Sequence, residues 1–368
     1  MKIGLIGTRG VPATYGGFET CVEEVGARLA DRGHEVVVYC RKGDRARREF
    51  RGMRLVHLPA MPVQSLETLS HSFLSTFHAS LFGLDCAIMF NVANAPCLSV
   101  LRMPVAVNTD GLEWKRGKWG PRGQRYLRWA ERRAAKSSDR VIADAVAIKE
   151  YLDSEYNTDA AYIPYGAPII SNEEAGSRTD VPVSPGEFHL LVARFEPENS
   201  IDVMLNGYLQ SRAELPLIVV GDTPYQTPYR ETCLELIARS DSVVHLGAVY
   251  DQDLLNWYYA NCLTYFGGQT VGGTSPSLLR AMGAGAAVIA RDTVYSHEVV
   301  GPDGRFYGSA EELSTHILAA ESDKPLARLL GERLRDRAAS RYRWEDVTDA
   351  YERLCAELAK RPVDSADR

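Results

Sequence analysis

Short apolar runs alternate with longer amphipathic stretches along most of the chain. The runs are continuous, as in EVVVYC at residues 35–40, which is typical of strands buried on both faces of a parallel sheet. We therefore predict an α/β protein whose parallel strands are joined by helices. The predicted strands are residues 2–7, 34–40, 53–58, 86–90, 104–108, 140–143, 188–194, 216–221, 242–246, 262–266 and 286–290. The predicted helices are residues 16–32, 66–84, 124–136, 200–210, 251–260, 276–283 and 344–359, with the rest of 291–343 largely helical.

The alternation breaks once, near the middle of the chain. The sequence IPYGAP at residues 163–168 is followed by a stretch rich in Ser, Asn, Glu, Gly and Pro, which indicates a linker. We predict two Rossmann-like domains, residues 1–168 and 187–340, with a linker at 169–186 and a terminal helical segment at 341–368. Two such domains favour a binding cleft between them, lined by the carboxyl ends of the strands.

Composition narrows the class of protein. The chain has 368 residues, 45% of them hydrophobic, and a net charge of -6, which suits a two-domain globular enzyme and argues against a general nucleic-acid binder. No apolar run reaches the roughly 18 residues that span a bilayer, and the start MKIGLIGTRG does not resemble a signal peptide. We expect a cytoplasmic protein. Its seven cysteines lack C-x-x-C spacing, so we expect reduced core thiols.

A glycine-rich loop, T-R-G-V-P-A-T-Y-G-G-F-E at residues 8–19, joins the first predicted strand to the first helix. Gly16 and Gly17 allow close approach of a ligand, and the helix N-terminus offers N–H groups to an anion. The loop is neither G-x-G-x-x-G nor a P-loop. The second strand ends in Tyr39-Cys40-Arg41-Lys42 rather than an acidic residue, which disfavours a dinucleotide site. The alternative is a turn that only reverses the chain.

Two further candidate sites lie in the second half of the chain. Arg194 ends a predicted strand in V-A-R-F-E-P-E-N-S, where its guanidinium can hold a diphosphate or pair with Glu196 or Glu198. The second glycine-rich loop lies in F-G-G-Q-T-V-G-G-T-S-P-S-L-L-R-A-M at residues 266–282, and it again joins a strand to a helix. Its candidate ligands for phosphate or sugar oxygens are Gly272, Gly273, Thr274 and Ser275.

Asp110 follows a predicted strand and precedes Gly111. It is a candidate general base, and the alternative is an Asp that shapes a turn. Asp251 and Asp253 form a D-x-D pattern at a predicted helix start, where capping explains them better than a metal. No His or Cys pattern has metal-ligand spacing, so we expect no metal and no cofactor.

At these sites the chain resembles the retaining GT-B glycosyltransferases of family four, the glycogen-synthase-like group. More narrowly, it resembles the bacterial rhamnosyltransferase branch of capsule and cell-wall polysaccharide synthesis. The motifs that carry the resemblance are G-T-R-G-V-P-A-T-Y-G-G-F-E-T (7–20), N-T-D-G-L-E-W-K-R (108–116), A-R-F-E-P-E-N (193–199) and V-G-G-T-S-P-S-L-L (271–279).

The resemblance implies a metal-independent transfer of a sugar, in this branch rhamnose, from a nucleotide-diphosphate sugar to a glycan, lipid-linked or small-molecule hydroxyl. It implies a diphosphate held by Arg194 and by N–H groups near Gly17 and Gly273, and a sugar pocket touched by Asp110. The first domain would then face the acceptor through Glu113, Trp114 and Lys115. The second would hold the base and ribose near Gly221, Asp222, Val249 and Tyr250, and the terminal helix would cross back onto the first domain.

Two departures from the wider group concern this donor site. Asn199 stands where the wider group has Lys, as in the rhamnosyl branch. The wider group also has two Glu separated by seven residues, and this chain has Gly272 and Arg280 there. Arg cannot accept hydrogen bonds from ribose hydroxyls. Either nucleotide binding is rebuilt, with Arg280 meeting a phosphate, or activity is weakened.

The first half also carries a basic, aromatic segment. Residues 114–140 hold ten Lys or Arg with Trp114, Trp119, Tyr126 and Trp129 among them, and residues 41–54 add seven more cations. This pattern is typical of a surface that rests on anionic lipid, and the alternative is a solvated helix face. Two other functions stay open: a sugar-nucleotide epimerase of the same fold, and a degenerate transferase that binds a partner without catalysis.

Overall fold

The computed structural model describes residues 1–13, 16–41, 45–61, 64–171, 176 and 178–361. Thr14 and Tyr15 of the first loop, Lys42, part of the predicted linker and the end of the terminal segment lie outside the described residues. The chain divides into two compact units. The first contains Met1–Lys115, Trp119–Tyr165 and Trp344–Arg368, and the second contains Arg116–Lys118 and Gly166–Arg343. The described part of the predicted linker, 169–186, is therefore grouped with the second unit.

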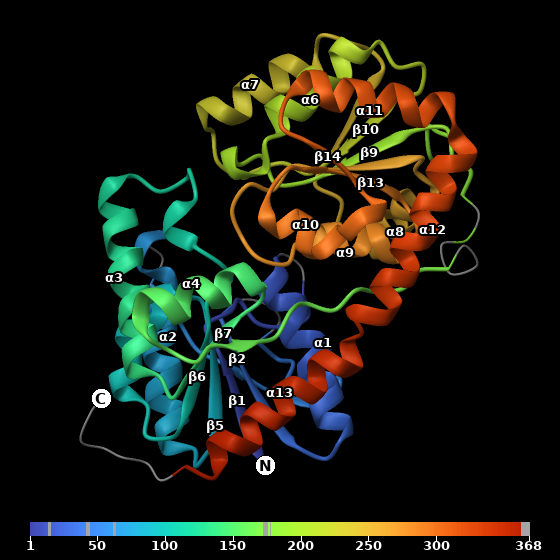
Figure 1. The fold of residues 1–368 in the computed structure, drawn as a ribbon. Coiled ribbons are helices and arrows are strands. Elements are labelled where there is room, and N and C mark those ends of the chain that lie inside the picture. The colour runs from blue at the N-terminus through green and yellow to red at the C-terminus, as the bar shows by residue number, and fades with distance from the viewer. Residues whose placement is uncertain (14–15, 42–44, 62–63, 172–175, 177, 362–368) are drawn as a thin grey trace. The chain divides into compact units, whose positions relative to one another are not determined.

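The first unit is built on one sheet in the order β3-β4-β2-β1-β5-β6-β7-β8 (Figure 1). All neighbouring strands are parallel except the β3–β4 pair, which is antiparallel. The strands are β1 Lys2–Ile6, β2 Glu35–Cys40, β3 Glu49–Phe50, β4 Met53–His57, β5 Cys86–Phe90, β6 Val105–Asn108, β7 Arg140–Ala143 and β8 Ala161–Tyr162.

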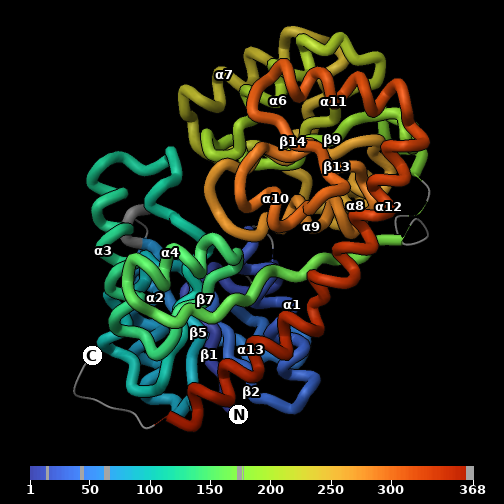
Figure 2. The backbone as a smooth tube through the Cα atoms, viewed as in Figure 1, coloured from blue at the N-terminus to red at the C-terminus, as the bar shows by residue number. Residues whose placement is uncertain are grey.

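Helices cover both faces of this sheet. Helix α1 (Gly17–Asp31) packs against α13 (Trp344–Ala359) on one face. On the other, the 3₁₀ segment η1 (Val92–Val100) contacts both α2 (Gln64–Leu81) and α3 (Pro121–Ser137), and α3 contacts α4 (Val146–Tyr156). Right-handed crossovers between parallel strands produce this division, and the tube in Figure 2 shows the red terminal helix beside α1. A short 3₁₀ turn, η2 (Glu113–Lys115), follows β6.

The second unit has an all-parallel sheet in the order β11-β10-β9-β12-β13-β14. The strands are β9 His189–Val192, β10 Leu217–Val220, β11 Val243–Gly247, β12 Thr264–Gly267, β13 Ala287–Arg291 and β14 Arg305–Tyr307. The helices and 3₁₀ turns are η3 Pro197–Asn199, α6 Ile201–Ser211, α7 Pro228–Ile237, α8 Gln252–Asn261, α9 Pro276–Gly283, α10 Val294–Val300, η4 Gly301–Asp303, α11 Ala310–Ser322 and α12 Lys324–Arg341.

The continuous apolar runs explain why these strands form the core. Every residue of β5, β6 and β10 is buried, as expected for strands covered on both faces. In the second unit Leu191, Leu217 and Phe266 pack in one cluster with side chains of α6 and α11. Burial of such side chains supplies about 1.5–3 kcal/mol each relative to exposure.

Several elements differ from the sequence prediction. Segment η1 and helices α4 and α7 fall where no element was predicted, and strand β14 interrupts the stretch predicted to be helical. Pro96 lies inside η1, which hides its helical character. In α4 only Ile148 and Leu152 are buried, too few for a clear amphipathic period.

All seven cysteines are buried and free, which confirms the expectation of reduced core thiols. Among the described residues, no helix is both long and apolar enough to cross a membrane. The described part of the chain also contains no cluster of three or more His, Cys, Asp or Glu suited to a metal ion.

Candidate functional site

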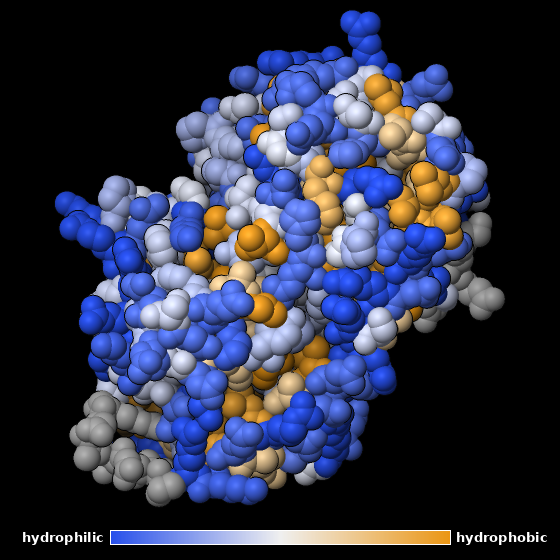
Figure 3. All heavy atoms as spheres, viewed as in Figure 1, coloured by the Kyte–Doolittle hydropathy of each residue, from blue (hydrophilic) through white to orange (hydrophobic). Residues whose placement is uncertain are grey.

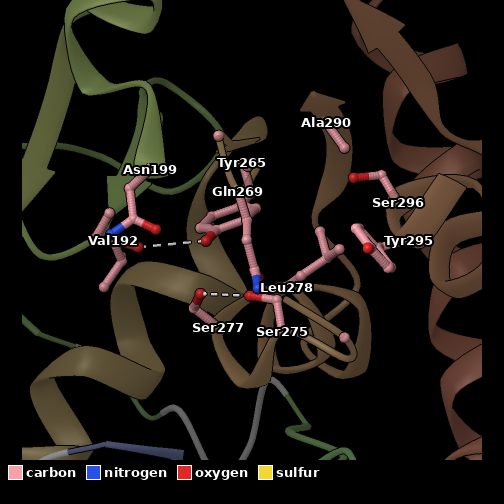
Figure 4. Close-up of a pocket in the computed structure, with 14 residues that line it drawn as sticks. Val192, Asn199, Tyr265, Gln269, Ser275, Ser277, Leu278, Ala290, Tyr295 and Ser296 are labelled. Carbon is pink, nitrogen blue, oxygen red and sulfur yellow. Dashed lines mark hydrogen bonds between the residues drawn. The ribbon is translucent and has the colours of Figure 1, made fainter. Parts of the chain in front are cut away.

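A pocket of about 460 Å³, open solvent included, lies in the second unit at the carboxyl ends of β9, β12 and β13. Parallel α/β sheets bind ligands at this edge. Figure 4 shows that the side chains come from these strands, from the loop after β12 and from the starts of α9 and α10. The lining residues are Val192, Ala193, Asn199, Tyr265, Gly267, Gly268, Gln269, Gly273, Ser275, Ser277, Leu278, Ala290, Tyr295 and Ser296.

The glycine loop after β12 is held close to the backbone that follows β9. A Cβ on Gly268 would lie 2.0 Å from the Asn199 carbonyl oxygen, so any larger residue would displace one of the two segments. The Thr270 N–H and hydroxyl both donate to the Glu198 carbonyl, at 2.8 and 3.0 Å. Gly272 has φ of 137°, which favours glycine. The loop is therefore a fixed wall of the pocket.

Helix α9 begins at the pocket with its N-terminus open. Ser275 is the N-cap residue but makes no capping side-chain hydrogen bond, Pro276 follows it, and the first turn has no acidic residue. The Ser275 and Ser277 hydroxyls lie 3.2 Å apart. The first N–H groups of a helix have no partner within the helix and attract anions. Of the predicted phosphate ligands, Gly273 and Ser275 line the pocket, whereas Gly272 and Thr274 lie beside them in the loop.

Arg194 lies two residues beyond the end of β9 and is half-buried. The Asn199 side-chain amide donates to the Arg194 carbonyl at 2.9 Å, which ties the two predicted site residues together. The pKa of Glu196 is raised by burial and by the charge of Glu198, and Lys118 and Arg194 oppose this rise. The positive charge of Arg194 therefore acts on the Glu196 carboxylate, and the contact of Arg194 with a diphosphate stays a prediction.

The sequence indicates Glu198 only as a partner for Arg194. Its side chain is 5% exposed, and neither carboxylate oxygen has a hydrogen-bond partner among the described residues. A buried carboxylate without donors is costly, so this position beside the pocket residue Asn199 is suited to accept hydrogen bonds from a ligand. The only sequence signal for it was the acidic E-P-E at a loop.

The predicted nucleotide residues lie at the ends of β10 and β11. A Cβ on Gly221 would lie 1.9 Å from the Ala193 carbonyl oxygen, so glycine is required there. Asp222 accepts from Arg230 Nε at 2.7 Å and Nη2 at 2.9 Å. The hydrogen bond to Arg230 lowers the pKa of Asp222 and burial opposes it. Val249 and Tyr250 follow β11, and Tyr250 is exposed.

Arg280 is held by α8 and does not line the pocket. Its Nε and Nη1 donate to the side-chain oxygens of Asn256 at 3.0 Å and Gln252 at 2.9 Å. Its guanidinium also lies 5.5 Å from the ring centroid of Tyr259. Burial lowers the pKa of Arg280 and the field of Tyr259 opposes it. These neutral partners explain how the chain accommodates an arginine where the wider group has Glu.

In the first unit, the turn before α1 already holds an acidic group. Gly16 is the N-cap residue with φ of 103°, and Gly17 begins the helix. Glu19, 8% exposed, accepts from the Arg9 N–H at 2.9 Å. Burial raises the pKa of Glu19, while hydrogen bonds from the backbone of Arg9 and Glu19 oppose the rise. An anion at this helix start would meet a carboxylate in the same turn.

Asp110 lies just beyond β6 in a network that reaches the terminal helix. Asp110 has φ of 53°, its N–H donates to Asn108 Oδ1 at 3.1 Å, and its carboxylate accepts from the Tyr165 hydroxyl at 3.3 Å. Asn108 Nδ2 donates to the Tyr351 hydroxyl on α13 at 2.8 Å. The buried Asp144 follows β7. The pKa of Tyr165 is raised chiefly by burial, and the charges of Asp110 and Asp144 add to the rise. Sequence reasoning missed Asp144 and Tyr351, because neither belongs to a recognised motif.

The predicted acceptor-side residues form η2 in the first unit. Glu113 is buried and accepts from the Trp119 indole N–H at 3.0 Å. The Trp114 ring lies 5.3 Å from Lys115 Nζ and 5.1 Å from Arg128 Cζ. Lys115 is exposed. The structure thus brings Gly273, Ser275 and Asn199 together in one unit, and Asp110, Glu113 and Gly16 belong to the other. Their convergence on one ligand stays a prediction.

Comparison with protein families gives two partial matches. Residues 188–323 match a model described as glycosyl transferases group 1, and residues 85–168 match one described as a domain of unknown function (DUF1972). The first contains the whole pocket, and the second contains Asp110, Asp144 and Glu113. No curated protein matches the chain.

Solved structures match over nearly the whole chain. Sucrose-phosphate synthase from Thermosynechococcus elongatus has a TM-score of 0.82 at 19% identity, covering 97% of this chain and 98% of that chain. HepE from Anabaena in complex with UDP and glucose has a TM-score of 0.79 at 18% identity, covering 97% and 100%. A trehalose-6-phosphate synthase from Burkholderia multivorans has a TM-score of 0.74 at 11% identity, covering 98% of both. These likenesses confirm the predicted two-domain α/β fold with parallel sheets, that of GT-B glycosyltransferases.

Proposed function

We propose that the protein is a glycosyltransferase that moves a sugar from a nucleotide-diphosphate donor to an acceptor hydroxyl. The observation that carries the proposal is the pocket of the second unit, where the open N-terminus of α9 meets the carboxyl ends of β9 and β12 inside the segment that matches the glycosyltransferase model. A helix start without acidic side chains is suited to the leaving diphosphate.

The donor is a nucleoside diphosphate sugar in this proposal. HepE has been crystallised with UDP, at 18% identity to this chain, and with UDP-glucose, at 17% identity, which supports a uridine or related donor. The diphosphate would contact the N–H groups at Gly273, Thr274 and Ser275, and the base and ribose would lie near Gly221 and Tyr250. Asp222 is committed to Arg230, so its part in ribose binding would require that ion pair to open.

The proposed chemistry exchanges one glycosidic bond for another. The bond from the anomeric carbon to the diphosphate oxygen breaks as the acceptor oxygen bonds to that carbon, and the acceptor proton passes to the departing diphosphate oxygen in a retaining reaction or to Asp110 in an inverting one. Arg194 and the α9 N-terminus would stabilise the charge that develops on the leaving diphosphate. The proposed mechanism includes no metal and no cofactor. In a retaining reaction Asp110 would orient the sugar, and in an inverting one it would take the proton.

The finer parts of the proposal rest on the sequence resemblance. They are a retaining outcome, rhamnose as the transferred sugar, and a glycan or lipid-linked acceptor at the cytoplasmic side of an anionic membrane. They also include the acceptor-side role of Glu113, Trp114 and Lys115.

A donor screen tests the proposal. Thermal shifts with UDP-, dTDP- and GDP-sugars should show one preferred nucleotide, and the matching donor should then give product with acceptor. Proton NMR of the new anomeric centre distinguishes retention from inversion. If no nucleotide sugar shifts the unfolding temperature at millimolar concentration, the proposal fails.

A degenerate, non-catalytic transferase is the second candidate. The observation that favours it is Arg280, which leaves no carboxylate at the position where the wider group has Glu. Selective donor binding without turnover of any acceptor would support it. An epimerase would instead release an altered nucleotide sugar without acceptor.

A further inference from the structure

We infer that the outward side of α2 and α3 docks on an anionic lipid surface. Two rows of side chains define this surface. The apolar row is Phe73, Phe77 and Leu81 on α2, and the basic row is Arg122, Arg125, Trp129, Arg132 and Lys136 on α3. The inference deepens the proposed function. It rests on that function in one respect only, which is that docking would give the protein access to a lipid-linked acceptor.

The apolar row is exposed although its side chains are large. Phe73, Phe77 and Leu81 are 52%, 54% and 69% exposed. Their spacing of four residues places them on one side of α2, and another side of the helix packs against η1. Single exposed apolar residues are ordinary, but a row of three large ones marks an interaction surface.

The basic row lies along the exposed side of α3. Its members follow at intervals of three and four residues, and all five are exposed, Trp129 at 50%. The only acidic residue of α3, Glu131, is fully buried and accepts from the Tyr151 and Tyr156 hydroxyls. The row is therefore cationic in a chain whose net charge is -6.

The two rows lie over the same face of the first sheet. Segment η1 contacts both α2 and α3, and both helices belong to right-handed crossovers on that face. The exposed side chains of both helices therefore belong to the same side of the first sheet. In Figure 3, α3 contributes mainly hydrophilic side chains to the face of the molecule that is drawn.

The chemistry of the rows selects the occupant. Arginines attract lipid phosphates, a Trp beside them suits the interface, and Phe and Leu side chains enter the acyl boundary. A second copy of the chain placed symmetrically on this surface would set like charges opposite one another, which is unfavourable. An anionic bilayer satisfies both rows at once.

Co-sedimentation of the full chain with vesicles tests the inference. We expect binding to phosphatidylcholine vesicles that contain phosphatidylglycerol, weak binding to phosphatidylcholine alone, and a loss of binding at high salt. The variant Arg122→Gln/Arg125→Gln/Arg132→Gln should bind roughly a hundredfold more weakly, at about fivefold per cation. The variant Phe73→Ser/Phe77→Ser/Leu81→Ser should lose at least about tenfold.

Matched controls carry the same chemical changes elsewhere. Arg239→Gln/Arg341→Gln/Arg353→Gln removes three exposed cations, and Leu318→Ser/Leu329→Ser removes side chains that are 44% and 43% exposed. Equal binding of the row variants and these controls, or equal binding to neutral and anionic vesicles, would overturn the inference. A fall in molecular mass of the apolar-row variant without lipid would overturn it in favour of self-association. The thermal shifts that nucleotide-sugar donors cause in the row variants should equal those of the parent. A failure of the docking inference can therefore be distinguished from a failure of the proposed function.

Discussion

Helices α1 and α9 both follow a buried parallel strand and a glycine-rich loop, but their N-termini differ in charge. At α1, Glu19 in the first turn is buried and accepts the Arg9 N–H. At α9 the first turn has no acidic residue, and the Ser275 and Ser277 hydroxyls face each other at the pocket. The two loops look alike in sequence because glycines dominate both.

This difference separates a loop that binds its own helix from one that is open to a ligand. In the first unit, Glu19 and Glu23 accept the Arg9 and Ala13 N–H groups, so carboxylates of α1 fix the loop from within. In the second unit the loop is fixed by backbone contacts with Glu198 and Asn199, which leaves the helix start free of negative charge. We therefore expect donor phosphate binding to depend chiefly on the second unit.

The largest effect is expected at Arg194. Arg194→Ala should lower turnover about a hundredfold, as for loss of a preorganised donor to a developing charge. Initial rates at saturating donor measure it, and Arg212→Ala, an exposed arginine of the same unit, is the control. Turnover within threefold of the parent would remove Arg194 from the mechanism.

The comparison itself is tested by placing an acid at each helix start. Ser275→Asp should weaken donor binding about tenfold or more, because it replaces a charge-assisted contact with repulsion, while Asp remains a good N-cap residue. Thr20→Asp in the first turn of α1 should change donor affinity much less. Isothermal titration with the preferred nucleotide measures both, and equal effects would break the comparison.

A smaller effect is expected where the first unit supports Asp110. Tyr351→Phe leaves the buried Asn108 amide without its acceptor, which should cost about 1–3 kcal/mol of stability. Turnover should fall several-fold while donor affinity stays constant. Tyr151→Phe, which removes a hydroxyl bound to Glu131 in the same unit, controls for general destabilisation and should leave turnover at the parent value. A change in donor affinity for Tyr351→Phe would contradict the separation of the two sites.

The smallest effect is expected at Glu19, and it depends on pH. Burial raises the pKa of Glu19 above 4.5, so ionisation is harder in the folded protein, and stability falls as pH rises from about 4.5 through the folded pKa. Glu19→Gln should remove this fall while keeping an acceptor for the Arg9 N–H. Hydrogen exchange of α1 peptides at pH 4.5 and pH 7 measures it. A variant less protected than the parent at pH 7 would show that the charged form stabilises the turn.

The sequence predicted the layered fold well, because its buried strands are continuous apolar runs. β2, β5 and β13 are examples in which pattern and burial agree. It missed β14, which has only three residues and in which Arg305 and Phe306 are only partly buried, and η1, whose Pro96 is more typical of a loop. Short elements have too few residues for periodicity to distinguish them from loops.

The candidate site could be predicted only where its residues are consecutive in the sequence. The glycine loop before α9 was visible because strand, loop and helix are consecutive. The hydrogen bond between Asn108 and Tyr351 joins residues 243 positions apart, and no motif marks it. The sequence also marks Glu19 as part of a ligand-binding motif, but not that its carboxylate turns back to Arg9.

The first unit takes residues from both ends of the chain, with α13 packed on α1. During synthesis, α1 and β5 therefore leave the ribosome long before α13, the helix that packs on both of them. The second sheet, built from one continuous stretch, has all its strands available earlier than the first unit has its last helix. We therefore expect the second unit to complete its fold before the first. A truncation before Trp344 should leave the second unit intact while it exposes the side of α1 that packs on α13.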